Sequence, residues 1–466
     1  MKPADLEYAE ATIAAIATPV GPGAIGVIKV SGQLSERILK RLFEPKRPVE
    51  EFQSHRLYYG FIKDPESGEL VDEVLVTLMR KPHSYTREDV LEIYGHSGYL
   101  VLTKILELVL REGARLAEPG EFTRRAFLNG RIDLSQAEAL LDLINARSEE
   151  GLRLALNQLK GVLAEKIAPL RETLLSALAV VEVAVDFPDE DVELLSHYQL
   201  AEQLERDVLS PLEALLASYQ SGRLYREGIA VVIAGRPNVG KSSLLNALLL
   251  EERAIVTPIP GTTRDVIEEF ANIRGLPVRL IDTAGLRETE DLVEEIGVRR
   301  AREKIAEADV VILLVDGSQE PQEEDFRLYQ EIKDRPHLIV VNKIDIASEE
   351  TLNLWKEAFA GEKIIFISAK EREGLEALAE SIFYLVTGSR REEAPQVAPN
   401  LRQKMALEKA KEAVERAIAN LKQPTVYPEL VAVDLRDALS SLGEITGEAT
   451  TEDLLDRIFS NFCLGK

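Results

Sequence analysis

The segment Gly235-Arg236-Pro237-Asn238-Val239-Gly240-Lys241-Ser242 has the composition and spacing of a loop that binds phosphate. It lies between an apolar run, 229–234, and an amphipathic run, 243–250, which together predict a strand, a loop and a helix. In that context successive backbone N–H groups converge on the phosphates, and the helix N-terminus adds partial positive charge. Lys241 would contact the β- and γ-phosphates, and the Ser242 hydroxyl would bind Mg²⁺.

Two further segments carry residues that suit the metal and the γ-phosphate. The segment 261–265, Gly-Thr-Thr-Arg-Asp, offers Thr263 as a second Mg²⁺ ligand. The apolar run 278–281 predicts a strand that ends at Asp282, where a carboxylate would hold a magnesium-bound water. Gly285, three residues later, would offer its N–H to the γ-phosphate.

A third pair of segments suits a guanine base. The predicted strand 338–341 leads to Asn342-Lys343-Ile344-Asp345, and the predicted strand 364–367 leads to Ser368-Ala369-Lys370. The Asp345 carboxylate can accept hydrogen bonds from the N1–H and 2-amino groups of guanine. Adenine lacks both donors, so Asp345 would select GTP over ATP. A backbone N–H of 368–370 suits guanine O6, and five motifs in this order predict a GTPase domain.

One position departs from the pattern of small signalling GTPases. Leu286 follows the Asp-Thr-Ala-Gly segment, where those enzymes carry a glutamine that orients the attacking water. Because leucine cannot position water, hydrolysis would need another device.

The composition limits the class of protein. With 466 residues, of which 45% are hydrophobic, a typical size of about 150 residues per domain predicts roughly three domains. No apolar run approaches the ~18 residues that a membrane span needs, and the acidic start of the chain lacks a signal-peptide core. The single cysteine, Cys463, excludes internal disulfides and multi-cysteine zinc sites. We therefore expect a cytoplasmic protein that crosses no membrane.

The formal net charge of −24 opposes non-specific binding of nucleic acid over the whole surface, but allows a local basic site. Three arginine clusters, Arg124–Arg125, Arg299–Arg302 and Arg390–Arg391, lack interleaved aromatic residues. We interpret them as solvated helix faces or ends. The five histidines are scattered, so we predict no histidine metal site.

The first part of the chain has the pattern of a mixed α/β domain. Apolar runs predict strands over 12–17, 26–30, 56–62 and 73–79 and a helix over 100–110. The segment 21–26 has the glycine spacing of a dinucleotide-binding fingerprint. Since a strand pattern follows it instead of a helix, we expect no dinucleotide site there.

The rest of the chain changes pattern twice. Residues 134–185 and a second stretch to about 219 have helical periodicity. From 223 to 388, apolar runs alternate with amphipathic segments, which predicts a parallel sheet with helices on both faces. A charged linker, 388–395, leads to a helical tail. The predicted fold is an α/β P-loop domain inserted in an all-α helical domain and preceded by an α+β domain, with domains 1–130, 131–222, 223–388 and 389–466.

Motifs in all three parts resemble those of one family, the MnmE (TrmE) family of tRNA-modification GTPases, over essentially the whole chain. They are Ala17-Thr18-Pro19 to Gly26, Val30-Ser31-Gly32, Ser84-Tyr85-Thr86, Glu88-Asp89, Gly95-His96, Gly120-Glu121-Phe122-Thr123, Ala126-Phe127-Leu128-Asn129-Gly130, the segment 261–265 and the terminal Phe462-Cys463-Leu464-Gly465-Lys466.

The resemblance implies a GTPase that potassium and dimerisation of the G domain activate, without a conventional arginine finger. A monovalent cation there would neutralise charge that develops on the phosphates. Asn238, Thr257, Ile259 and Thr262 would bind K⁺, and Glu294 would orient the attacking water indirectly. From the residues alone, the simpler interpretation is that Asn238 shapes the turn and Glu294 is a solvated helix charge.

The resemblance also implies that the N-terminal domain binds a one-carbon tetrahydrofolate, in its 5-formyl or 5,10-methylene form. Its ligands would be Lys29, Glu92, Arg131 and Lys466. A carboxylate suits the N–H donors of the pterin, and cations suit the folate's carbonyls and carboxylates. Some relatives are expected to have arginine at the position of Lys29. Lysine cannot make the bidentate contact that an arginine would make there. Cys463 could act near the folate or be a small buried apolar residue.

The implied reaction is modification of C5 of the wobble uridine of certain tRNAs, by addition of an aminomethyl or carboxymethylaminomethyl group. The implied partners are a second copy of the chain, the flavin-dependent subunit MnmG in a heterotetramer, and tRNA. The alternative is a switch-type GTPase that acts in ribosome assembly.

The complete prediction for the nucleotide site combines motif and resemblance. The expected catalytic residues are Lys241, Asp282 and Glu294. The expected GTP-binding residues are Asn238, Val239, Gly240, Lys241, Ser242, Ser243, Thr257, Pro258, Ile259, Pro260, Gly261, Thr262, Thr263, Asp282, Thr283, Ala284, Gly285, Asn342, Lys343, Asp345, Ser368, Ala369 and Lys370.

Overall fold

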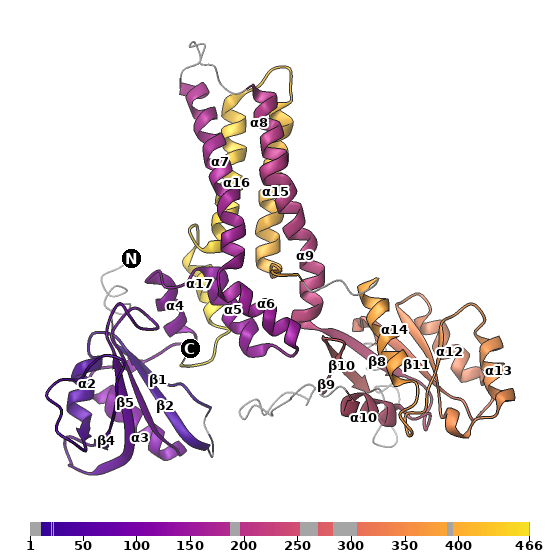
Figure 1. The fold of residues 1–466 in the computed structure, drawn as a ribbon, viewed down its shortest axis with the longest axis horizontal. Helices are drawn as coiled ribbons and strands as arrows, with labels where there is room; N and C mark the ends of the chain where they lie inside the picture. The colour runs from indigo at the N-terminus through magenta and orange to yellow at the C-terminus, as the bar shows by residue number, and fades with distance from the viewer. Residues whose placement is uncertain are drawn as a thin grey trace, which may run out of the picture.

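The computed structural model describes residues 11–19, 21, 23–186, 196–251, 269–282, 305–388 and 395–465. Figure 1 shows an upright bundle of helices with a sheet region beside its base on either side. The chain builds the N-terminal sheet region first, then half of the helical region, then the inserted α/β region, and finally the rest of the helices. This is the predicted fold class.

The N-terminal sheet region is built on seven strands in the order β3-β4-β5-β6-β2-β1-β7. All neighbours are antiparallel except β1 and β7. The predicted strands and helix are confirmed, and segment 21–26 leads into β2 instead of a helix. The elements are β1 Ile13–Ile16, β2 Gly23–Ser31, α2 Ser35–Leu42, β3 Phe43–Pro45, β4 Leu57–Lys63, β5 Leu70–Met79, β6 Val90–Ser97, α3 Tyr99–Arg111, β7 Arg115–Leu116 and α4 Glu121–Leu128.

The two faces of this sheet are covered differently. Helices α2 and α3 pack on one face around a core that includes Ile28, Ile93 and Ile105. On the other face, Phe122 of α4 packs with Ile13 and two buried alanines at the β1 side. The strands further from β1 leave side chains such as Tyr59 and Leu75 partly exposed on that second face.

The helical region owes its core to two segments that are far apart in the sequence. Leu170 and Leu212 from the first half share one cluster with Leu407, Val414 and Leu442 from the second. A π-helical turn, Glu205–Leu209, separates α8 from α9. The helices are α5 Leu134–Asn145, α6 Glu149–Leu159, α7 Val162–Asp186, α8 His197–Leu204, α9 Ser210–Glu227, α15 Leu401–Leu421, α16 Pro428–Thr446 and α17 Glu452–Phe459.

The inserted α/β region contains a sheet of six strands in the order β13-β12-β11-β8-β10-β9. The predicted helices on both faces are present: α10 and α14 line one core, and Trp355 of α13 lies in the other. One part of the prediction is wrong, because β9 runs antiparallel to β10 at the edge. The elements are β8 Ile229–Ala234, α10 Lys241–Glu251, β9 Glu269–Ile273, β10 Leu276–Asp282, β11 Val310–Asp316, α12 Glu323–Ile332, β12 His337–Asn342, a 3₁₀ turn Ile344–Ile346, α13 Glu349–Ala358, β13 Ile364–Phe366 and α14 Leu375–Thr387.

At the junction between the helical and inserted regions, the last helix of the first helical half runs past residue 222. Helix α9 continues to Glu227 and ends at Gly228, whose φ of 75° and ψ of −168° suit glycine. The Arg226 guanidinium donates to the carbonyl of Ala398 at 2.7 Å and that of Pro399 at 3.3 Å. Arg226 thus joins the segment that enters the inserted region to the segment that leaves it.

Among the described residues, no helix is both long enough and apolar enough to cross a membrane. In the same part of the chain, His, Cys, Asp and Glu side chains form no cluster of three or more that could hold a metal ion.

Candidate functional site

The predicted phosphate loop follows the fully buried strand β8 and precedes α10. Its backbone is unusual at two points: Asn238 has φ 63° and Gly240 has φ 101°. A side chain at Gly240 would place its Cβ 2.4 Å from Nδ2 of Asn342. Glycine is therefore required at this position both for the turn and for the close approach of β12.

Lys241, the first residue of α10, is held on the loop that it belongs to. Its Nζ donates to the backbone oxygens of Gly235 at 2.9 Å and Arg236 at 2.8 Å, and the residue is only 8% exposed. Ser242 and Ser243 are exposed at the first turn of the same helix. A cation and hydroxyl groups thus lie together at a helix N-terminus, where partial positive charge favours an anion.

Asn342 connects the phosphate loop to the segment after β13. Its Nδ2 donates to the backbone oxygen of Val239 at 2.9 Å, and its Oδ1 accepts from the N–H of Ala369 at 3.0 Å. The residue is 2% exposed. The Asn342 carboxamide therefore joins its own segment to the phosphate loop and to the segment at Ala369, which are more than a hundred residues apart in the sequence.

Lys343 makes a second connection, through a residue that the sequence analysis missed. Its Nζ donates to the backbone oxygen of Asn238 at 2.8 Å and to Oδ2 of Asp316 at 2.6 Å. Asp316 ends β11 and is 3% exposed. Burial would raise the pKa of Asp316, but hydrogen bonds from Lys343 and Ser318 outweigh it and lower that pKa. Asp316 therefore supplies the negative charge that anchors Lys343 against the loop.

Asp345, the predicted guanine-reading residue, is exposed in the 3₁₀ turn after β12. Its Oδ1 accepts a hydrogen bond of 2.7 Å from the hydroxyl of Ser368, which is fully buried. The same Ser368 Oγ accepts from the N–H of Glu371 at 3.1 Å. The structure thus brings 345 and 368 together and fixes the orientation of the carboxylate, while Lys370 is exposed beside them.

Three of the four predicted folate ligands lie close together in the N-terminal sheet region. Lys29 on β2 and Glu92 on β6 are direct cross-strand neighbours. Lys29 Nζ lies 5.6 Å from the ring centroid of Tyr85, and the guanidinium carbon of Arg131 lies 4.6 Å from it. Tyr94 donates a hydrogen bond to Glu92, and burial, together with that carboxylate, raises the pKa of Tyr94.

The end of the chain returns to the same region. The N–H of Gly120 approaches the backbone oxygen of Cys463 at 3.5 Å. A side chain on Gly465 would lie 2.7 Å from the backbone oxygen of Ile16, at the end of β1. Cys463 is exposed, so the alternative of a small buried apolar residue is wrong.

The interpretation of the Arg124–Arg125 cluster as a solvated helix face is wrong for Arg125. It is 5% exposed and donates to Glu88 and Glu121. Its neighbour Arg124 forms an ion pair of 2.7 Å with Asp456 of α17. Both arginines therefore fix α4 in place.

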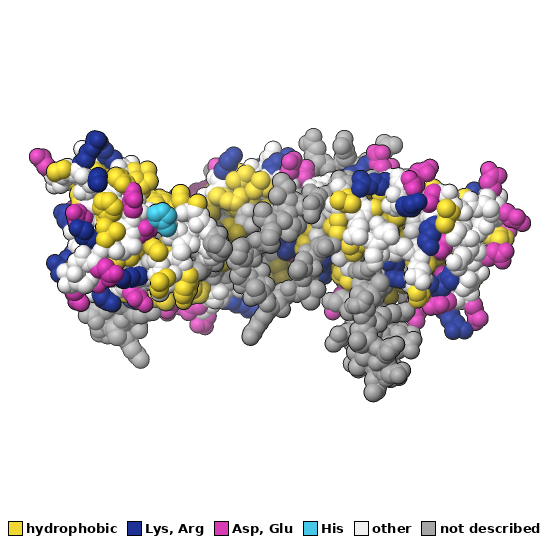
Figure 2. All heavy atoms as spheres, turned by 90° about the horizontal axis from the view of Figure 1, so that it is seen from below, with side chains coloured by type: hydrophobic (Ala, Val, Ile, Leu, Met, Phe, Trp, Pro, Cys, Tyr) yellow, Lys and Arg dark blue, Asp and Glu magenta, His cyan; other side chains and the backbone are white. Residues whose placement is uncertain are grey.

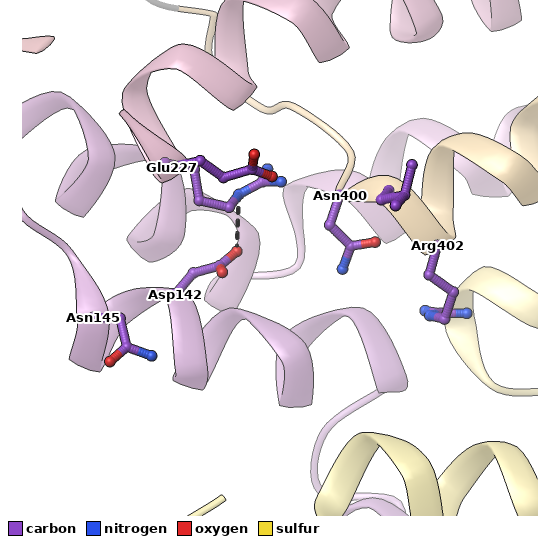
Figure 3. Close-up of a pocket in the computed structure, with 7 residues that line it drawn as sticks. Asp142, Asn145, Glu227, Asn400 and Arg402 are labelled. Carbon is purple, nitrogen blue, oxygen red and sulfur yellow. Dashed lines mark ion pairs between the residues drawn. The ribbon is translucent and has the colours of Figure 1, made fainter. Parts of the chain in front are cut away.

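A cavity of about 390 Å³ lies at the junction of the helical and inserted regions. Asp142 lines it and forms an ion pair of 3.1 Å with Arg226, which a dashed line from Asp142 marks in Figure 3. Burial is the main cause that raises the pKa of Asp142 to about 6; Arg226 opposes this rise, and the charges of Glu138 and Glu227 add to it.

Comparison with known proteins covers nearly the whole chain. The MnmE helical domain family matches residues 134–463, and the family of the GTP-binding protein TrmE N-terminus matches residues 12–131. The chain is 51% identical to the tRNA modification GTPase MnmE of Syntrophus aciditrophicus over 98% of its length and 99% of the relative's. The chain belongs to the MnmE family.

Further relatives agree with this assignment. The MnmE proteins of Desulfotalea psychrophila and Aquifex aeolicus are each 48% identical, over 99% and 97% of this chain and 100% and 99% of their own lengths. Among solved structures, an Era variant from Aquifex aeolicus bound to GDP and AlF₄⁻ is 28% identical over 40% of this chain and 66% of its own. Its TM-score of 0.28 makes that a distant, partial likeness.

Twelve of the predicted site residues lie outside the described residues. They are Thr257, Pro258, Ile259, Pro260, Gly261, Thr262, Thr263, Thr283, Ala284, Gly285, Glu294 and Lys466. For Asp282 the structure gives the backbone position, at the carboxyl end of β10 beside β8, and not the side chain.

Proposed function

We propose that this chain is a GTPase that acts in tRNA modification. The observation that carries the proposal is the joining of the guanine segments to the phosphate loop by Asn342 and Lys343 in a chain of the MnmE family. An exposed carboxylate that Ser368 orients stands at the end of this assembly. The relatives named above are tRNA modification GTPases.

In this proposal each residue of the nucleotide site has one role. Lys241 exchanges the two carbonyl groups that it now contacts for the β- and γ-phosphate oxygens, and Asp345 binds the guanine edge. Ser242 and Thr263 would hold Mg²⁺, with Asp282 behind a metal-bound water. Hydroxyl oxygens are suitable ligands for that ion, and bound Mg²⁺ would neutralise charge on the phosphates.

Potassium activation is proposed for the same loop. Asn238 is exposed, and within the described part of the chain its hydrogen bond to Lys343 uses the backbone oxygen and not the side chain. Its side-chain oxygen is therefore available to a monovalent cation, which Thr257, Ile259 and Thr262 would complete. Such a cation would supply the charge that an arginine finger provides elsewhere. Glu294 would orient water indirectly, and pairing of two inserted regions would complete the site.

The N-terminal cluster is proposed to bind a one-carbon tetrahydrofolate. Two cations and a carboxylate, Lys29, Arg131 and Glu92, come from three separate segments. Lys466 directly follows Gly465, which lies against β1. The folate would supply the carbon that is added to C5 of the wobble uridine, in concert with the flavin-dependent subunit MnmG. Cys463, which is exposed, is an additional candidate.

We propose that the chain forms a homodimer, and with MnmG a heterotetramer, in the cytoplasm, and the open face of the N-terminal sheet is a candidate surface for the homodimer. Tyr59, Leu75, Tyr94 and Val27 form one row across four strands. Tyr59 and Leu75 are 44% and 41% exposed, and Figure 2 shows hydrophobic side chains on the surface of this region. An exposed apolar face of this kind favours a protein partner.

We propose four segments as domains: a folate-binding domain, 1–130; a first helical half; a G domain that ends at 388; and a second helical half. Because α9 ends at Glu227, the G domain is better begun at Gly228.

GTP hydrolysis in matched concentrations of KCl and NaCl tests the nucleotide part of the proposal. We expect faster turnover in KCl. Equal rates in the two salts would remove the potassium assignment, and absence of GTP hydrolysis in both, with and without MnmG, would overturn the GTPase assignment.

Calorimetric titration with 5-formyl-tetrahydrofolate tests the second site. The full chain should bind it, and a chain without its last five residues should bind it more weakly because Lys466 is lost. A full chain that ignores the folate would remove the main support for the modification reaction and favour a GTPase that acts in another process.

A further inference from the structure

Tyr85 lies against two cations in the N-terminal cluster. The guanidinium carbon of Arg131 and Nζ of Lys29 are 4.6 and 5.6 Å from its ring centroid. Both distances fall within the ~6 Å over which the electron-rich face of an aromatic ring attracts a cation. Within the described part of the chain, neither cation forms an ion pair with a carboxylate. One ring therefore holds together two positive charges that would otherwise repel each other.

The ring itself is fixed from two directions. The Tyr85 hydroxyl shares a hydrogen bond of 3.0 Å with the Thr123 hydroxyl of α4. The next residue, Thr86, is fully buried and shares a bond of 2.6 Å with Ser31 of β2. Ser31 lies two residues beyond Lys29 on that strand, so the strand that carries Lys29 also holds the loop that carries Tyr85.

The turn that carries Arg131 is attached to the same loop. Asn129 donates from Nδ2 to the backbone oxygen of Thr86 at 2.7 Å, and Arg87 returns a bond of 3.0 Å to the Asn129 backbone oxygen. The N–H of Arg131 donates to the Ala126 backbone oxygen at 2.8 Å. Tyr85, Lys29 and Arg131 therefore come from three segments that are hydrogen-bonded to one another outside the cluster.

Glu88 strengthens this attachment. Its carboxylate accepts from Ser31 at 2.6 Å and from Arg125 at 3.2 Å, and Arg125 is buried. The loop 84–89 is thus tied to both β2 and α4. Such a framework can keep two like charges at a set spacing before any ligand arrives, which lowers the cost of ordering them on binding.

We propose that Tyr85 is a positioning residue, which holds Lys29 and Arg131 as a pair for the oxygens of an anionic ligand. This inference rests on the proposed function, in which that ligand is a one-carbon tetrahydrofolate. Tyr85 acts through the face of its ring, so the ring is required and the hydroxyl group is secondary.

Affinity for 5-formyl-tetrahydrofolate, measured by calorimetry, tests the role of the ring. Tyr85→Phe keeps the aromatic face and should bind within about twofold of the wild type. Tyr85→Leu loses the face and should bind roughly tenfold more weakly. Equal weakening in both variants would assign the effect to the hydroxyl and overturn the inference.

A double-mutant cycle tests whether Tyr85 acts through Lys29. In a Lys29→Met background, the effect of Tyr85→Leu should shrink to about twofold, because one of the two cations that the ring holds is gone. Full additivity of the two changes would overturn the positioning role. Circular dichroism and thermal unfolding of each variant establish that the region is folded, and Tyr85→Met replaces Tyr85→Leu if the latter does not fold.

The two levels of the inference fail separately. A wild-type chain that does not bind the folate overturns the proposed site and leaves Tyr85 without a role. A wild-type chain that binds it, alongside a Tyr85→Leu variant of equal affinity, overturns the role of Tyr85 alone.

Discussion

Ser368 orients the Asp345 carboxylate, which we propose binds the guanine base. A carboxylate on a short exposed turn has several rotamers, but the buried hydroxyl 2.7 Å away selects one of them. In this proposal, selection of guanine comes from the cost of binding the wrong base, because the carboxylate then loses the two N–H donors that guanine offers.

Replacement of Asp345 by asparagine should change the preferred base. The amide can donate to the 2-oxygen of xanthine, so Asp345→Asn should weaken GTP and favour xanthosine triphosphate. Competition between the two nucleotides, followed by hydrolysis rates, measures the change. Unaltered selectivity for GTP would contradict the base-reading role.

At the residue scale, the positions that local motifs encode could be picked out from the sequence. Lys241, Asn342, Asp345 and Ser368 were predicted from short patterns behind apolar runs, and the structure joins them. Asp316 was not predicted, because its partner, Lys343, follows 27 residues later and only the parallel pairing of β11 and β12 brings them together.

At the scale of elements, the protonation of Asp142 affects the contact between α5, which carries it, and α9, which carries its partner Arg226. Its pKa is raised from 3.8 to about 6 in the folded chain, chiefly by burial. The folded state therefore binds a proton more tightly than the unfolded state does between these two values. Stability from this group is greatest below about pH 4 and is lost as pH rises toward 6.

Replacement of Asp142 by asparagine should remove that contribution. We expect the difference in thermal midpoint, wild type minus Asp142→Asn, to decrease as the pH rises from about 4 to about 6 and to stay constant above about pH 6. Circular dichroism of the helical signal gives both midpoints. Asp453→Asn, on the exposed start of α17, is the matched control, and a flat difference curve for Asp142→Asn would contradict the raised pKa.

One glycine at each end of the inserted region allows a second test of the junction. Gly228 and Gly388 have φ angles of 75° and 74°, but a Cβ on Gly228 would lie 2.3 Å from the backbone oxygen of Pro277, whereas none lies within 4 Å at Gly388. Gly388→Ala should cost about 1 kcal/mol for the left-handed backbone. Gly228→Ala should cost more than about 3 kcal/mol, because β10 must also move.

Denaturant unfolding of the two alanine variants decides this point. Equal losses of stability would mean that the contact between Gly228 and β10 is relaxed in solution.

The helices and strands were largely predictable from the sequence, since alternation and helical periodicity are local. The direction of β9 was not, because residue types in an edge strand do not reveal which way it runs.

At the scale of the whole molecule, the end of the chain attaches the helical region to the N-terminal sheet region. Phe462 is 4% exposed in a cluster with Leu134 and Phe459, whereas Leu464, two residues later, is 53% exposed. Both belong to one short terminal motif that the sequence shows without indicating which side chain is buried.

Phe462→Ala should therefore destabilise the chain by about 3–5 kcal/mol, as expected for a large core side chain. Leu464→Ala should change stability by less than about 0.5 kcal/mol. Thermal unfolding compares the two variants directly. A Phe462→Ala variant as stable as Leu464→Ala would show that the end of the chain is not packed in solution.

The shared core of the helical region has a consequence for synthesis. Leu170 and Leu212 are made early, yet Leu407 and Leu442, which cover them, leave the ribosome only after the entire insert. The early helices must wait for roughly ten seconds or more at ordinary elongation rates, with their apolar stripes uncovered. Translation would thus complete the nucleotide-binding module before the scaffold that carries it, and chaperones would meet this chain at its α7 to α9 segment.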